Sequence, residues 1–145
     1  DVLMLTDKDK IEQFKRDLRS YTYHQKMVTE IDYKIEELKV KLQGVSSPDM
    51  KPVVLENAGD PYRENKIALM MEEGELMNER NKHLLEMKKI DEALRLLPAE
   101  EQDVLIQVYI LRKRYDSVAV DSNKSRATLF RDINQSILNI LKNAT

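Results

Sequence analysis

Three short stretches in the last third of the chain decide its fold: LLPAEEQDVLIQVYI at residues 96–110, YDSVA at residues 115–119 and NKSRATLFR at residues 123–131. Pro98 suits the first turn of a helix, where its missing N–H is not needed. Ser125 can cap the helix that follows, along which apolar residues recur at helical spacing. We therefore expect three helices in residues 98–145, with a tight turn before the last.

The segment between the second and third expected helices is polar and turn-forming. It lacks the glycine that such turns commonly use and has Ser122 and Asn123 instead. Asparagine tolerates a left-handed backbone better than most residues do, so the turn remains feasible. The three helices then form a helix-turn-helix, whose last helix places its first turns in the major groove of DNA.

Two groups of side chains are candidates for DNA contact. Arg112, Lys113 and Arg114 lie between the first two expected helices and can contact phosphate, although a solvated loop explains them equally simply. The second group occupies the turn and the first turns of the last helix, where recognition helices make base and phosphate contacts. It consists of Lys124, Ser125, Arg126, Thr128 and Arg131.

The order of these residues resembles region 4 of bacterial σ70-type factors. The shared features are the leucine-proline opening, the aromatic residue that ends the first helix, the Tyr115-Asp116 pair and the run from Ser125 to Arg131. The resemblance implies a DNA-binding head. This chain departs from the pattern at Asp121 and Asp132, where σ-like modules often carry basic residues. The departures favour the alternative of a three-helix packing module that binds nothing.

Two long helices are expected before this head. Residues 7–43 contain no glycine or proline, and the heptad spacing of their apolar residues is typical of coiled coils. Thr6 or Asp7 can cap the start, and Gly44 is expected to end the helix. The seam consists of Ile11, Phe14, Leu18, Tyr21, Gln25, Val28, Ile31, Ile35, Leu38 and Leu42.

Residues 44–60 are rich in glycine, serine and proline and are predicted to be a loop. Asp60-Pro61 then resembles an N-cap followed by a first-turn proline. The second long helix continues to Leu97, and its expected apolar seam consists of Met70, Met77, Leu84, Met87, Ile90, Leu94 and Leu97.

Neither long helix can bury its apolar stripe alone. An antiparallel hairpin solves this within one chain, and a dimer of four bundled helices solves it between two chains; both remain open. The expected fold is therefore all-α, with a long coiled-coil-like hairpin over residues 1–97 for oligomerisation or partner binding. A DNA-binding head over residues 98–145 follows.

This layout also resembles the RinA/ArpU-type late transcription regulators of phages that infect Gram-positive bacteria. The specific likeness lies in residues 60–69 and 94–141, while the layout covers nearly the whole chain. The resemblance implies a phage-encoded, sequence-specific regulator that activates late genes for packaging and lysis by binding promoter DNA. Double-stranded DNA is then the main partner, and host RNA polymerase is a second candidate.

Composition limits the alternatives. The 145 residues contain no cysteine, and their net charge is −2. Residues 98–145 carry seven basic and six acidic residues, so a single head would bind DNA weakly. We therefore expect a homodimer. No run of about 18 apolar residues predicts a membrane span, and the expected location is the cytoplasm of the bacterial host.

No motif predicts catalysis, a metal site or a cofactor. His83 and the glutamates around it are more simply a solvated helix face than metal ligands or catalytic acids. Two other functions stay open. The chain could be a helical protein-binding inhibitor or antirepressor, which the near-neutral charge favours. It could also be the DNA-binding small subunit of a phage packaging terminase.

Overall fold

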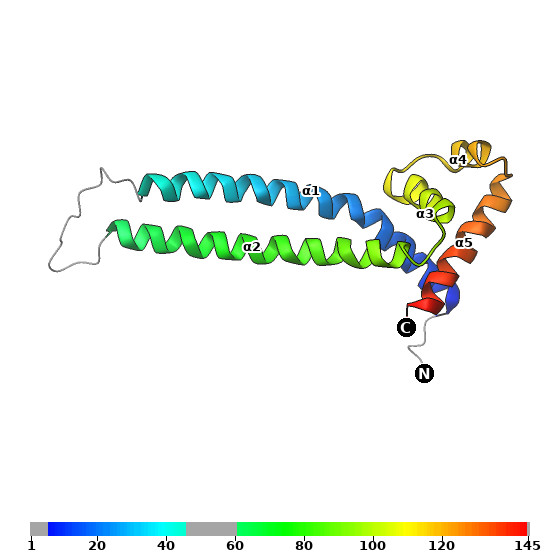
Figure 1. The fold of residues 1–145 in the computed structure, drawn as a ribbon, viewed down its shortest axis with the longest axis horizontal. Helices are drawn as coiled ribbons and strands as arrows, with labels where there is room; N and C mark the ends of the chain where they lie inside the picture. The colour runs from blue at the N-terminus through cyan, green and yellow to red at the C-terminus, as the bar shows by residue number, and fades with distance from the viewer. Residues whose placement is uncertain (1–5, 46–60, 145) are drawn as a thin grey trace. The chain divides into compact units, whose positions relative to one another are not determined.

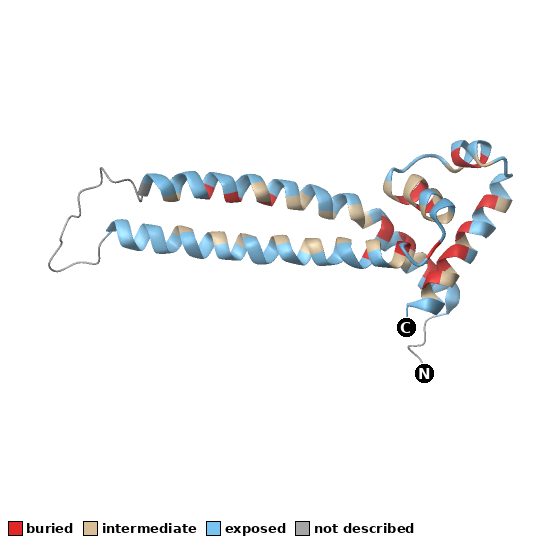
Figure 2. Ribbon diagram, in the orientation of Figure 1, coloured by how far each residue is buried: buried red, intermediate tan, exposed pale blue. Residues whose placement is uncertain are grey.

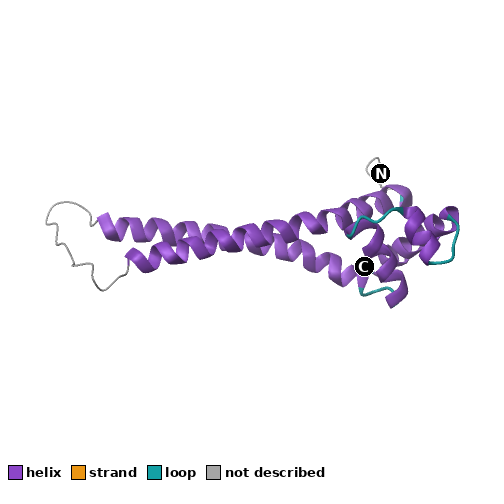
Figure 3. Ribbon diagram, turned by 90° about the horizontal axis from the view of Figure 1, so that it is seen from above, coloured by secondary structure: helices purple, strands orange, loops and turns teal. Residues whose placement is uncertain are grey.

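The computed structural model describes residues 6–45 and 61–144, and all regular structure in these ranges is helical (Figures 1 and 3). The expectation of an all-α chain with two long helices is confirmed. No described helix combines the length and the apolarity that crossing a membrane requires. The helices are α1 (Asp7–Val45), α2 (Pro61–Leu94), α3 (Ala99–Leu105), the π-helix η1 (Ile106–Ile110), α4 (Tyr115–Asp121) and α5 (Arg126–Asn143).

The chain divides into two compact units. Unit 1 combines residues 1–24 with residues 86–145, and unit 2 consists of residues 25–85. The beginning of α1 thus belongs with the C-terminal helices, so unit 1 is larger than the head expected from sequence. The functional boundary at residue 98 remains a prediction.

Unit 1 has a well-formed core. Both sequence segments of unit 1 contribute to this core, because Ile11 and Leu18 of α1 belong to the same buried cluster as Ile90 and Leu94 of α2. Figure 2 shows buried residues on every helix of the unit. The C-terminal helices contribute Leu105, Val108, Tyr109, Val118, Ala119, Leu129, Ile133, Ile137 and Ile140.

Unit 2 is a pair of antiparallel helical segments that lie side by side in both views (Figures 1 and 3). Among the residues of this unit that the structure describes, Ile31, Ile35 and Leu38 are buried, and all three belong to α1. These three follow the heptad seam expected from sequence, whereas Gln25 of that seam is exposed. No residue of α2 between positions 61 and 85 is buried, so the two helices of this unit contribute unequally to its core.

The expected seam of α2 was wrong in its first half. Met70 and Met77 are 54% and 42% exposed. The half-buried residues of this stretch instead follow a 4-3 spacing from Leu69 through Leu76 to His83, with Glu73 and Arg80 between them. Both stripes satisfy a seven-residue period, so periodicity could not decide which one is covered by α1.

The half-buried stripe of α2 contains charged residues, and one of them forms an ion pair with α1. Arg80 donates from Nε to a carboxylate oxygen of Asp32 at 2.5 Å, which joins the two helices of unit 2. The long aliphatic stem of an arginine can cover apolar surface while its guanidinium remains at the edge. Arg80 therefore occupies a seam position without burying an unpaired charge.

The observed helix ends match most of the local signals. Thr6 caps α1, since its hydroxyl accepts a hydrogen bond from the backbone N–H of Asp9 at 3.2 Å. Asp9 in turn accepts a bond from the Thr6 backbone N–H, as in a capping box. Pro61 begins α2 as expected. Gly44 does not end α1, which continues to Val45, and residues 46–60 of the predicted loop lie outside the described residues.

Candidate nucleic-acid interface

The turn between α4 and α5 is closed by backbone hydrogen bonds around Asn123. Asn123 has a φ of 55°, the left-handed conformation expected from its identity. Its N–H bonds to the carbonyl of Val120 at 3.1 Å, and the N–H of Lys124 bonds to the carbonyl of Ala119 at 2.9 Å. These two bonds form a Schellman motif, in which asparagine takes the place of the usual glycine.

The start of α5 is fixed by its cap. The Ser125 hydroxyl accepts a hydrogen bond from the Thr128 backbone N–H at 3.1 Å and also lies 2.9 Å from the Thr128 hydroxyl. Arg131 donates to that threonine hydroxyl at 3.4 Å. Ser125 and Thr128, both predicted to contact DNA, are therefore partly occupied in holding the helix terminus.

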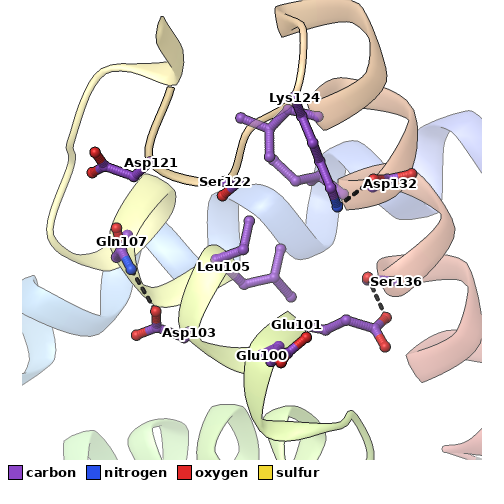
Figure 4. A pocket seen from close by; sticks show the side chains of 13 residues that line it. Glu100, Glu101, Asp103, Leu105, Gln107, Asp121, Ser122, Lys124, Asp132 and Ser136 are labelled. Atoms are coloured by element: carbon purple, nitrogen blue, oxygen red, sulfur yellow. Dashed lines mark hydrogen bonds and ion pairs between the residues drawn. The ribbon is translucent and has the colours of Figure 1, made fainter. Parts of the chain in front are cut away.

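Lys124 lies at an acidic hollow. It donates to a carboxylate oxygen of Asp132 at 2.6 Å, and the pair is half-exposed (Figure 4). Glu101 on the same hollow accepts a hydrogen bond from Ser136 at 2.6 Å. This surface repels phosphate more than it attracts it, because a single ammonium group faces several carboxylates. The carboxylates that line it belong to Glu100, Glu101, Asp103, Asp121 and Asp132.

Two basic residues of α5, Arg126 and Arg131, lie on a different side of the helix from the acidic hollow. Arg126 and Arg131 line a second, shallow and largely apolar hollow together with Tyr115, Ala127 and Phe130. The Arg126 side chain is 73% exposed, and its nearest carboxylate, Asp116, is 3.9 Å away and equally exposed. Such an exposed pair holds the guanidinium only weakly. Arg126 and Arg131 are thus brought together around an exposed aromatic ring.

The inner face of the Phe130 ring contacts a buried lysine that was not predicted from the sequence. Lys15 of α1 is 2% exposed, and its ammonium lies 4.6 Å from the centre of the Phe130 ring. The same ammonium pairs with Glu12 at 3.3 Å. A cation below an aromatic ring is attracted by the negative face of the ring. The contact fixes Phe130, which is 45% exposed, at the edge of the second hollow.

Two tyrosines continue this aromatic group. The hydroxyls of Tyr109 and Tyr115 are hydrogen bonded to each other, and the Tyr115 ring lies 6.3 Å from that of Phe130. Burial, followed by the bond to Tyr115, raises the pKa of Tyr109. Tyr109 is therefore a neutral structural group. The guanidinium carbon of Arg19 lies 5.1 Å from the centre of its ring.

The three basic residues before α4 do not act alike. Arg112 has a φ of 57° and donates to the backbone carbonyl of Arg19 at 3.2 Å, so it is turned onto α1. Lys113 and Arg114 are exposed. Arg114 directly precedes Tyr115 and is the N-cap residue of α4, which places it at the same end of α4 as the second hollow.

No group of three or more His, Asp or Glu residues within residues 6–45 and 61–144 could hold a metal ion. The chain matches no protein-family model, no curated protein and no solved structure.

Proposed function

We propose that this chain is a sequence-specific double-stranded-DNA-binding transcription regulator that uses α5 as its recognition helix. One observation carries the proposal. The Asn123 turn and the Ser125 cap fix the start of α5, whose first two turns carry Arg126 and Arg131 on either side of an exposed Phe130. Recognition helices of helix-turn-helix proteins contact bases with the same turns.

The side chains at this surface suit different parts of DNA. Arginine can pair with both acceptors of a guanine edge, whereas an aromatic or methyl group can contact the methyl group of thymine. Arg126 and Arg131 are five residues apart and so point about 140° apart around the helix axis. One guanidinium can then reach a base while the other reaches phosphate. Lys113 and Arg114 are further candidates for phosphate contact.

The acidic hollow defines the limits of the interface. It holds Lys124 in an ion pair with Asp132, and we therefore assign Lys124 a smaller share of DNA affinity than the sequence implied. Phosphate cannot approach Lys124 without also approaching the carboxylates. The interface proposed here consists of Arg126, Phe130 and Arg131, with Lys113 and Arg114 beside it.

The biological role proposed is activation of late phage genes. It is supported by the resemblance of residues 60–69 and 94–141 to RinA/ArpU-type regulators. An all-α chain with two long helices before short C-terminal ones agrees with that layout. Host RNA polymerase is the proposed protein partner, since activation requires one.

The acidic hollow also favours a second candidate function, that of a helical protein-binding module. Its carboxylates lie on a surface that is separate from Arg126 and Arg131, and they would suit a basic protein segment. In that case the basic side of α5 would have no role in DNA recognition.

The test is fluorescence anisotropy with labelled fragments of the genome that encodes the chain, at several salt concentrations. Arg126→Ala should weaken the preferred site by about 1–3 kcal/mol and reduce discrimination there. Arg126→Ala/Arg131→Ala should reduce affinity further and lower the salt slope by about one, since one of the two guanidiniums is assigned to phosphate. Lys8→Ala/Lys10→Ala removes the same charge from exposed positions of α1 and should leave the preferred site unchanged.

A variant of the acidic hollow sharpens the same test. Asp132→Asn should release Lys124 and raise affinity for all fragments alike, since it removes a negative charge beside α5. If the double arginine variant folds and binds DNA as well as the unchanged protein does, α5 is not a DNA reader. The protein-binding function then becomes the better explanation.

A further inference from the structure

We propose that a second copy of this chain binds along an uncharged stripe of α2 between Ile67 and Leu85, with the two α2 helices antiparallel. The proposal concerns self-association and does not depend on DNA binding by α5. It rests on the side chains of unit 2, on their spacing and on the charges beside them.

The stripe consists of large apolar side chains that the structure leaves uncovered. They are between 42% and 64% exposed, although side chains of this size are normally buried. Methionines dominate, and their flexible thioethers adapt readily to a partner surface. The exposed apolar residues of the stripe are Ile67, Met70, Met71, Met77 and Leu85.

The stripe is also free of charge. Gly74, Asn78, Asn81 and the half-buried Leu84 complete it, and at 100° per residue its members cover an arc of about 140°. Every charged residue between positions 67 and 85 falls outside that arc. In a helix as highly charged as α2, an uncharged arc of this width is typical of a contact surface.

The stripe is distinct from the surface of α2 that contacts α1. That surface contains Leu76 and Arg80, and it is joined to α1 through Asp32. Arg80 and Leu76 lie roughly 110° and 150°, respectively, around the helix from the middle of the stripe. Unit 2 therefore uses one side of α2 internally and leaves a second apolar side without a partner among the described residues.

The spacing along the stripe selects a helix as the occupant. Positions 67, 70, 74, 77, 81 and 84 are separated alternately by three and four residues. This is the period at which one helix packs its side chains between those of another. An antiparallel pair would align Ile67 with Leu84 of the second copy, and Gly74 with Met77 of the second copy.

Size complementarity favours this alignment. No atom lies within 4 Å of the position that a Cβ of Gly74 would occupy, so the surface there is open. Met77 of the second copy would fill that space, and by symmetry the same contact would occur twice. A parallel pair would instead place glycine beside glycine and leave a gap in the middle of the interface, which would cost packing energy.

Charge complementarity favours it as well. In the antiparallel register Glu73 lies across from Arg80 of the second copy, and the twofold axis repeats the pair. Arg80 already contacts Asp32 through Nε, and its terminal nitrogens provide further donors. In the parallel register Glu73 would lie across from Asn78, and the charge pair would be lost.

The apolar surface is sufficient for a specific dimer. Five half-exposed large side chains from each copy would bury on the order of 1,000 Å² in total, which is the lower limit for a specific interface. Stronger association would require more surface than the stripe provides. We therefore expect a dimer that forms at micromolar concentration.

Disulfide trapping tests the register directly, because the chain contains no cysteine of its own. Ile67→Cys and Leu84→Cys are made as two single variants, and each is oxidised alone and in an equimolar mixture. The antiparallel pair predicts a disulfide between the two variants only in the mixture. Within either variant alone the two cysteines would be about 25 Å apart along the helices, beyond disulfide reach. Disulfide-linked dimers of Ile67→Cys alone would overturn the proposal.

Light scattering tests the interface itself. Met77→Glu should raise the dimer dissociation constant at least about 100-fold, since it places two charges in an apolar contact. Val40→Glu is the matched control, because Val40 is 66% exposed on α1 and outside the stripe, and this variant should remain dimeric. Circular dichroism should show equal helix content in both variants.

Two outcomes would overturn the proposal. One is an unchanged protein that remains monomeric at tens of micromolar, and the other is a folded Met77→Glu variant that dimerises normally. Arg126→Ala/Arg131→Ala should leave the dimer intact. Failure of the DNA-binding proposal and failure of this one therefore give different results.

Discussion

Units 1 and 2 contain similar apolar spacing along their helices but bury very different amounts of it. In unit 1, segments from every described helix enclose a cluster of fourteen buried apolar residues. In unit 2 two helical segments bury three, and all three belong to α1. The difference shows that heptad spacing provides an apolar stripe, whereas the number of neighbouring elements decides whether the stripe is covered.

The same difference governs where charge is tolerated. Unit 2 accepts Arg80 at a seam position because the side chain is 30% exposed and pairs with Asp32. Unit 1 buries Lys15 almost completely and compensates it with Glu12 and the rings around it. Water can therefore solvate the charges of a two-helix unit, whereas the buried charges of a multi-helix core need partners within the protein.

The largest expected difference between the units concerns cavity formation. Ile137→Ala in unit 1 should lower the free energy of unfolding by about 4 kcal/mol, because the surrounding helices cannot close the cavity. Leu38→Ala in unit 2 should cost about 2 kcal/mol, since water can enter and the two helices can approach each other. Chemical denaturation followed by circular dichroism measures both. Equal losses would mean that unit 2 is enclosed as completely as unit 1.

A smaller effect is expected at the buried lysine. Lys15→Ala should cost about 2 kcal/mol, because it removes the packed stem together with the contact to Phe130. Lys15→Met keeps the stem and should cost under about 1 kcal/mol. Lys26→Ala, at an exposed position of α1 in unit 2, should change stability by less than about 0.5 kcal/mol. A loss for Lys15→Met as large as that for Lys15→Ala would assign the main role to the charge.

The smallest expected effect concerns the ion pair of unit 2. Asp32→Ala should lower the free energy of unfolding by only about 0.5 kcal/mol, because both partners are partly exposed and water screens the pair. Glu36→Ala breaks a more exposed pair with Lys39 and should change stability even less. A loss above about 2 kcal/mol for Asp32→Ala would show that the pair, and not Ile31, Ile35 and Leu38, holds unit 2 together.

The candidate site could be predicted from sequence in part. Asn123 and Ser125 were identified as turn and cap residues, and the structure gives them those conformations. These are local effects that depend on a few neighbouring residues. The ion pair between Lys124 and Asp132 and the support of Phe130 by Lys15 could not be foreseen, because they join residues whose separation only the packed helices decide.

The sequence by itself determined that the described chain is helical, where α1 and α2 begin, and most of the residues of α1 that form its seam. Capping, the fixed backbone of proline and helical periodicity act over a few residues, so they can be read directly from the sequence. Only the tertiary structure decided which stripe of α2 faces α1. Both stripes share the same period, and the choice depends on the side chains that α1 presents, among them Asp32, which pairs with Arg80. Likewise, only the tertiary structure joined the start of α1 to the C-terminal helices, since the shared core forms from residues about ninety or more positions apart.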